Sequence, residues 1–185
     1  LTVENPAMTD ILYGIAAEHP TLTDRALMRY ADLASQSVVT PIRRYQLYRQ
    51  ALALRPSAAV QAKLLGYLSG VYALPALMLA AEYLDDAQTA APAAAAVKTI
   101  VAKCNPMPGG EAVRKALERA HEVYKELAKS DADAGYAVDE ITGLLGKIPA
   151  DGFAVLPADG LAGWTAVAVN PAEAKTLPAR QAAKL

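Results

Sequence analysis

Pairs of amphipathic helical segments follow one another through residues 22–148, and this repetition limits what the chain can fold into. The clearest pair consists of Leu74–Leu84, a turn at Asp85-Asp86, and a second apolar segment at Ala87–Lys103. A single pair of this kind cannot bury its own apolar face, so neighbouring pairs must stack on it. The pattern therefore predicts an all-α stack of helix pairs.

Helix start and stop signals divide the rest of this region. The expected starts are residues that cap free amide groups or suit the first turn: Asn5-Pro6, Thr21 or Thr23, Pro41 and Ser57. The expected breaks are rich in proline, glycine or aspartate: His19-Pro20, Arg55-Pro56, Gly70, Asn105–Gly110 and Asp131–Asp133. A longer helix is expected from about Glu111 to Lys129, and a last one ends near Ile148. The sequence thus predicts about eight antiparallel helices.

The second helices of the pairs can be laid over one another. The matching triplets, with offsets of 37, 33 and 41 residues, are Leu27-Tyr30-Ala31, Leu64-Tyr67-Leu68, Val97-Ile100-Val101 and Val138-Ile141-Thr142. Unequal offsets of this size fit a degenerate helical repeat, and four pairs exceed the roughly three that a stable array needs. We expect residues 1–149 to form one right-handed α-α superhelix.

The sequence changes character after Pro149. Phe153–Leu156 and Trp164–Val169 are candidate strands, and Asn170-Pro171 can begin a short helix. Two strands and a helix in roughly 35 residues are too few for an independent domain. We expect residues 150–185 to be a short extended appendage, the start of a further domain. The chain begins at Leu1 rather than at methionine, so we expect it to be a fragment of a larger protein.

Composition excludes several classes of function. Eighteen basic and nineteen acidic residues nearly cancel, so the excess of positive charge typical of nucleic-acid binding is missing. Lys63, Glu82 and Lys98 interrupt the apolar stretches well short of the ~20 residues that a membrane span needs. Cys104 is the only cysteine, which excludes an internal disulfide and any multi-cysteine zinc site. We therefore expect no nucleic-acid partner and no membrane span.

The densest cluster of binding-type residues consists of Arg43, Arg44, Tyr45, Tyr48 and Arg49. Arginine and tyrosine are typical anchors of binding surfaces, so these five are the candidate binding residues. The competing interpretation places Tyr45 in the core, in register with its apolar neighbours, and makes Arg43 and Arg44 a solvated face.

No catalytic or metal-binding pattern is recognisable. His121 lies beside Glu118 and Glu122 but lacks a third ligand, and His19 precedes a proline at a helix end. The aspartates at the turns are better explained as helix caps than as calcium ligands, because no glycine-centred loop surrounds them. Cys104 follows an apolar helix, as a small hydrophobic residue would. We expect no catalytic residue, metal or cofactor in this chain.

The middle of the chain resembles the HEAT-type repeats of extracytoplasmic proteins from carbohydrate-degrading bacteria. The stretches that carry the resemblance are Tyr48-Arg49-Gln50-Ala51-Leu52, Leu64-Leu65-Gly66-Tyr67-Leu68, and Ala76-Leu77 through Tyr83-Leu84-Asp85-Asp86. The resemblance implies an α-α superhelix that binds a partner, in a protein of the periplasm or cell surface.

The tail carries a second resemblance. Gly152-Phe153-Ala154-Val155-Leu156, followed by Asp159-Gly160-Leu161-Ala162-Gly163-Trp164, is similar to the opening of the 3-keto-disaccharide hydrolase family, which has a concanavalin-like β-sandwich. The pattern departs at Pro157-Ala158, where that family has Phe-Asn, and it ends before any sugar site. The resemblance implies a glycoside-processing domain beyond this chain and no active site within it.

Together these features predict a non-catalytic interaction or scaffold module of a larger carbohydrate-related protein. Its expected partner is a neighbouring domain of the same parent chain or another protein, with a carbohydrate as a further possibility. Two other hypotheses about the function stay open at this point. The helices could form part of the substrate cleft of a glycoside hydrolase, or they could be a cytosolic protein-binding adaptor.

Overall fold

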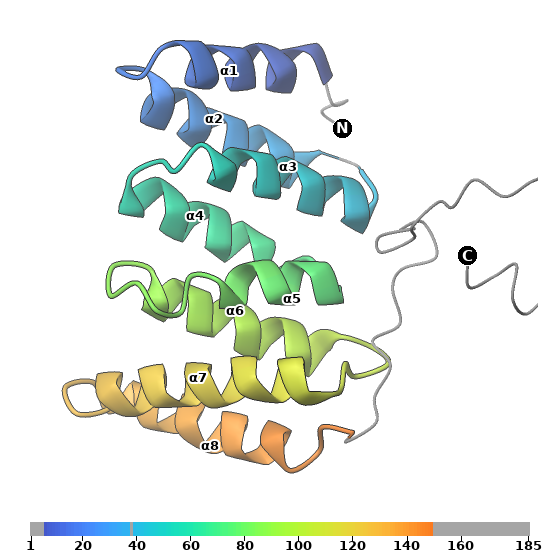
Figure 1. Ribbon diagram of the computed structural model, residues 1–185, viewed down its shortest axis with the longest axis vertical. Coiled ribbons are helices and arrows are strands. Elements are labelled where there is room, and N and C mark those ends of the chain that lie inside the picture. Colours follow the sequence, from blue (N-terminus) through green and yellow to red (C-terminus); the bar gives the residue numbers. More distant parts are fainter. Residues whose placement is uncertain (1–5, 38, 150–185) are drawn as a thin grey trace, which may run out of the picture. The chain divides into compact units, whose positions relative to one another are not determined.

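The computed structural model describes residues 6–37 and 39–149, and in these ranges the chain forms eight α-helices and no strand (Figure 1). Their bounds are α1 Pro6–Glu18, α2 Thr23–Gln36, α3 Pro41–Ala53, α4 Ala58–Leu68, α5 Leu74–Ala81, α6 Ala90–Lys103, α7 Glu111–Leu127 and α8 Asp133–Leu145. The expected all-α class is confirmed for this region. All eight helices belong to the first of two units of the chain, Leu1–Val155. The strands and helix expected in the tail lie outside the described residues.

The helices pack in two layers within this unit. Helices α2, α4, α6 and α8 lie side by side in one layer, each in contact with the next. Helices α3, α5 and α7 follow one another in the other layer, and α1 packs on α2 (Figure 1). From α2 onward, each helix therefore contacts its sequence neighbour and, where the described region has one, the helix two places along the chain. These contacts let each pair cover the apolar face that it cannot bury alone.

The first residue of the overlaid triplet is buried in three of the four second helices. Leu27, Leu64 and Val97 have no exposed surface, and each fully buried side chain of this size contributes about 1.5–3 kcal/mol. In α8 only Ile141 of the triplet is buried, while Val138 is half-buried and Thr142 is exposed. Among the described helices, α8 packs mainly on α7 and to a smaller extent on α6, so less of its surface is covered.

Polar side chains join neighbouring helices beside this core. The buried Tyr30 hydroxyl donates to the carbonyl of Leu47 at 3.0 Å and accepts from the Gln50 amide at 2.6 Å, which links α2 to α3. Asp32 of α2 accepts from Lys63 at 2.7 Å and from the Tyr67 hydroxyl at 2.8 Å, both on α4. These bonds hold α2 against two neighbours at once.

Two expected helix caps behave differently in the structure. Ser57 does precede α4, but its hydroxyl makes no capping hydrogen bond, and its own amide donates to Asp24 at 3.0 Å. Thr23 is the first residue of α2 rather than its cap, and its hydroxyl donates to the Ala16 carbonyl at 2.8 Å. Thr40 caps α3 by accepting from the Arg43 amide at 3.3 Å. Of the three hydroxyls, that of Thr23 bonds to the preceding helix, and that of Thr40 bonds to the helix it caps.

The turn between α5 and α6 is longer than expected. Helix α5 ends at Ala81 instead of Leu84, and α6 begins at Ala90 instead of Ala87. Asp86 explains the delay, because its carboxylate accepts from the Gln88 amide at 2.9 Å and its carbonyl accepts from the amides of Thr89 and Ala90. An aspartate that bonds to the backbone two residues on favours a turn over a continuing helix. Asp86 therefore shapes the turn and does not cap α6.

Candidate functional site

The five candidate binding residues on α3 are divided between surface and interior. Arg43 and Arg49 are exposed, Arg44 and Tyr45 are half-buried, and Tyr48 is 1% exposed. The Tyr48 ring lies 6.3 Å from the Tyr67 ring, centroid to centroid, and nearly parallel to it. Burial raises the pKa of Tyr48 to about 12, so its phenol stays protonated at neutral pH. The structure thus brings Arg43 and Arg49 to the surface of α3 and places Tyr48 in the core.

Among the three arginines of this cluster, Arg44 is the one whose side chain donates a hydrogen bond to another described residue. Its Nη2 donates to the carbonyl of Ser37 at 3.0 Å, which ties α3 to the end of α2. Its Nε is buried and has no hydrogen-bond partner within the described residues. A binding role for the five residues stays a prediction.

The remaining titratable candidates occupy structural positions. His121 Nε2 lies 3.1 Å from the Thr142 hydroxyl, across the α7–α8 contact, and His19 is exposed. Burial raises the pKa of the Cys104 thiol, so the thiolate needed for nucleophilic attack is disfavoured. Asp85 accepts from Arg119 of α7 at 2.7 Å. In the part of the chain that the structure describes, no group of three or more histidine, cysteine, aspartate or glutamate side chains could hold a metal ion.

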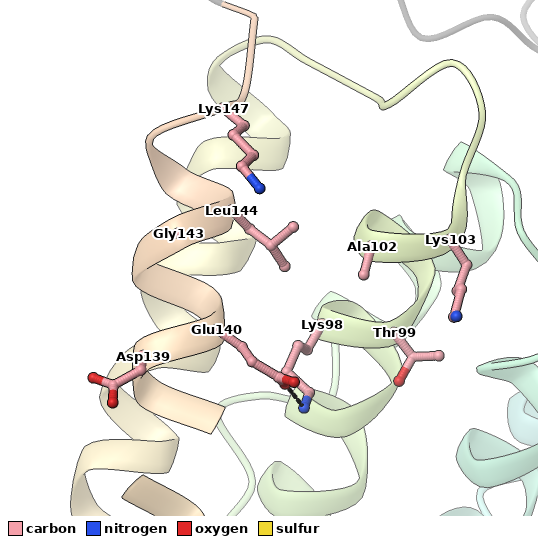
Figure 2. Close-up of a pocket in the computed structure, with 9 residues that line it drawn as sticks. All are labelled: Lys98, Thr99, Ala102, Lys103, Asp139, Glu140, Gly143, Leu144 and Lys147. Atoms are coloured by element: carbon pink, nitrogen blue, oxygen red, sulfur yellow. Dashed lines mark hydrogen bonds and ion pairs between the residues drawn. The ribbon is translucent and has the colours of Figure 1, made fainter. Parts of the chain in front are cut away.

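A groove between α6 and α8 has a volume of about 480 Å³ (Figure 2). We call it the α6–α8 groove. One wall is formed by residues of α6: Lys98, Thr99, Ala102 and Lys103. The other is formed by residues of α8 and the turn after it: Asp139, Glu140, Gly143, Leu144 and Lys147. Leu144 and Ala102 face each other across it (Figure 2).

Charges are unevenly distributed along the α6–α8 groove. At one end Lys98 forms an ion pair with Glu140 and lies 5.8 Å from the centre of the Tyr124 ring. At the other end, where both helices finish, Lys103 and Lys147 have no ion-pair partner among the described residues. A site with two free ammonium groups beside an apolar floor can bind an anionic group attached to an apolar body.

Sequence reasoning did not find this groove. Lys103 and Lys147 are 44 residues apart in the sequence, and nothing in the local pattern says that their helices lie side by side. Gly143 was the one sequence feature that could have indicated the groove. A glycine inside an amphipathic helix weakens the helix, so it usually has a packing or functional reason.

A second hollow lies between α1 and α2 and has a volume of about 330 Å³. Its lining includes the apolar residues Leu12, Ile15 and Leu22 together with Arg25 and Arg29. It is smaller than the α6–α8 groove and combines an apolar floor with arginine side chains.

Comparison with known proteins gives no relative for this chain: no family model, curated protein or solved structure matches it. Among the described helices, none has both the length and the apolar character that crossing a membrane requires.

Proposed function

We propose that this chain is a non-catalytic interaction module, a HEAT-like α-α superhelix that docks a protein partner or a neighbouring domain of a larger carbohydrate-related protein. The proposed location is extracytoplasmic, in the periplasm or at the cell surface. The location and the link to carbohydrates are supported by the sequence resemblances of residues 45–103 and 152–164.

One observation carries the docking role: the α6–α8 groove lies between successive helices of one layer and offers free cationic groups beside apolar surface. Stacked helix pairs characteristically present such surfaces to partners. Some other charged side chains are used within the stack, as Asp32 is with Lys63 and Asp85 is with Arg119. Charges of the groove that are not paired within the stack are available to bind a partner.

The proposal is tested by offering the full 185-residue chain two kinds of ligand. One sample is presented to a random peptide library, and a parallel sample is incubated with a panel of oligosaccharides while reducing ends are measured. We expect peptides to be retained and no oligosaccharide to be hydrolysed. Release of reducing ends by the purified chain, or failure to retain any peptide, would contradict the proposed function.

A further inference from the structure

Positive charge without an internal partner gathers at one end of the α6–α8 groove. Lys147 points into the groove from the side of α8, and Lys103 lines the opposite wall at the end of α6, with its side chain directed away from Lys147 (Figure 2). Asp139 points away from the groove in the same view. Glu140 is engaged by Lys98, so it does not neutralise the other two lysines. An ammonium group that has no internal partner is available to bind a carboxylate.

The floor of the groove is apolar and leaves room for a side chain. Leu144 is half-buried against the core, and Ala102 faces it from α6. A Cβ atom placed on Gly143 would meet no atom within 4 Å, so this glycine borders open space. The volume of about 480 Å³ falls in the range of roughly 300–1,000 Å³ that is usual for ligand sites.

The lining residues argue against a sugar in this groove. None of them is aromatic, so the groove offers no ring face on which a sugar could stack. Lys103 also lies in the last turn of α6, where a positive charge interacts favourably with the helix dipole.

We propose that the α6–α8 groove docks an acidic segment of a partner protein, with an apolar side chain of that segment against Leu144 and its carboxylates on Lys103 and Lys147. The inference rests on the proposed function, because it names the partner chemistry of that interaction module. The positive charge of the lysines favours an acidic segment, and the apolar floor favours an apolar side chain among its acidic residues.

Peptide selection on the full chain and on three variants tests this inference. Gly143→Phe fills the groove, and Gly66→Phe is its matched control, because Gly66 is also helical, exposed and bordered by open space. The third variant, Lys103→Gln with Lys147→Gln, removes both free charges and leaves the shape of the stack. Circular dichroism melting of each variant checks that it is folded.

We expect the retained peptides to be rich in aspartate and glutamate around a large apolar residue. Gly143→Phe and the double lysine variant should each bind them about tenfold or more weakly, and Gly66→Phe should bind them as the unaltered chain does. Retained peptides that are neutral or basic would overturn the inference. So would equal binding by Gly143→Phe, although the proposed function would then survive at another surface. Retention of no peptide would overturn both.

Discussion

Tyr30 illustrates how single side chains hold neighbouring helices together. Its hydroxyl is fully buried and bonded to both the Leu47 carbonyl and the Gln50 amide. Tyr30→Phe leaves these two groups without that partner, so we expect a loss of about 1–3 kcal/mol in the free energy of unfolding. Urea denaturation measures it. Tyr72→Phe is the control, because Tyr72 is 51% exposed, and its unfolding midpoint should not change.

Asp32 is a second link, and its contribution depends on pH. Hydrogen bonds from Lys63, which has the larger effect, and from Tyr67 lower the pKa of Asp32 in the folded chain. Because the folded pKa lies below the unfolded value of about 3.9, the stabilisation is fully present above about pH 4. It is lost as the pH falls through the folded pKa.

Asp32→Asn should therefore destabilise the chain by about 1 kcal/mol at neutral pH, a modest value because the pair is partly exposed. The difference from the unaltered chain should shrink as the pH falls below about 4. Urea denaturation across this range measures it, with Asp139→Asn as a control on an exposed carboxylate. A difference that stays constant with pH would contradict the assigned role of Asp32.

The end of helix α3 carries a local conformational cost. Arg55 follows the last turn with φ of 49°, the left-handed region that glycine adopts most easily. Its amide donates to the Leu52 carbonyl at 3.0 Å, which closes the helix. We expect Arg55→Gly to raise the free energy of unfolding by about 0.5–1 kcal/mol.

Arg55→Ala separates backbone from side chain in this prediction. Alanine removes the charge but keeps the Cβ atom that disfavours a positive φ, so it should give no gain. Equal stabilisation by Arg55→Gly and Arg55→Ala, measured by thermal unfolding, would show that the backbone conformation is not the cause.

Most helix bounds could be predicted because proline and glycine act locally. Pro41, Leu74 and Glu111 begin helices where the sequence placed them. The turn around Asp86 was missed, since an aspartate can cap a helix or delay it, and the choice depends on which amides the backbone brings near. Thr23 was misassigned for a similar reason: the carbonyl of Ala16, in the preceding helix, takes its hydroxyl.

At the scale of the described helices, the helical repeat predicted which positions are buried, but it did not predict the α6–α8 groove. Leu64 and Val97 are buried as the overlay of the second helices requires, because the same face meets the same kind of neighbour each time. The candidate cluster on α3 was chosen by residue type, and its Tyr48 lies in the core. The α6–α8 groove depends on contacts between helices far apart in sequence, which residue type and local spacing do not encode.

We infer that each helix pair is stabilised mainly by its immediate neighbours, so that stability is built up along the stack. Ile141→Ala tests this inference, because Ile141 is fully buried in α8 and its truncation should cost about 2–5 kcal/mol. Native-state hydrogen exchange of the full chain then measures the stability of each helix. We predict that the amides of α7 and α8 lose protection while those of α2 and α4 keep theirs. An equal loss in all of these helices would contradict the inference.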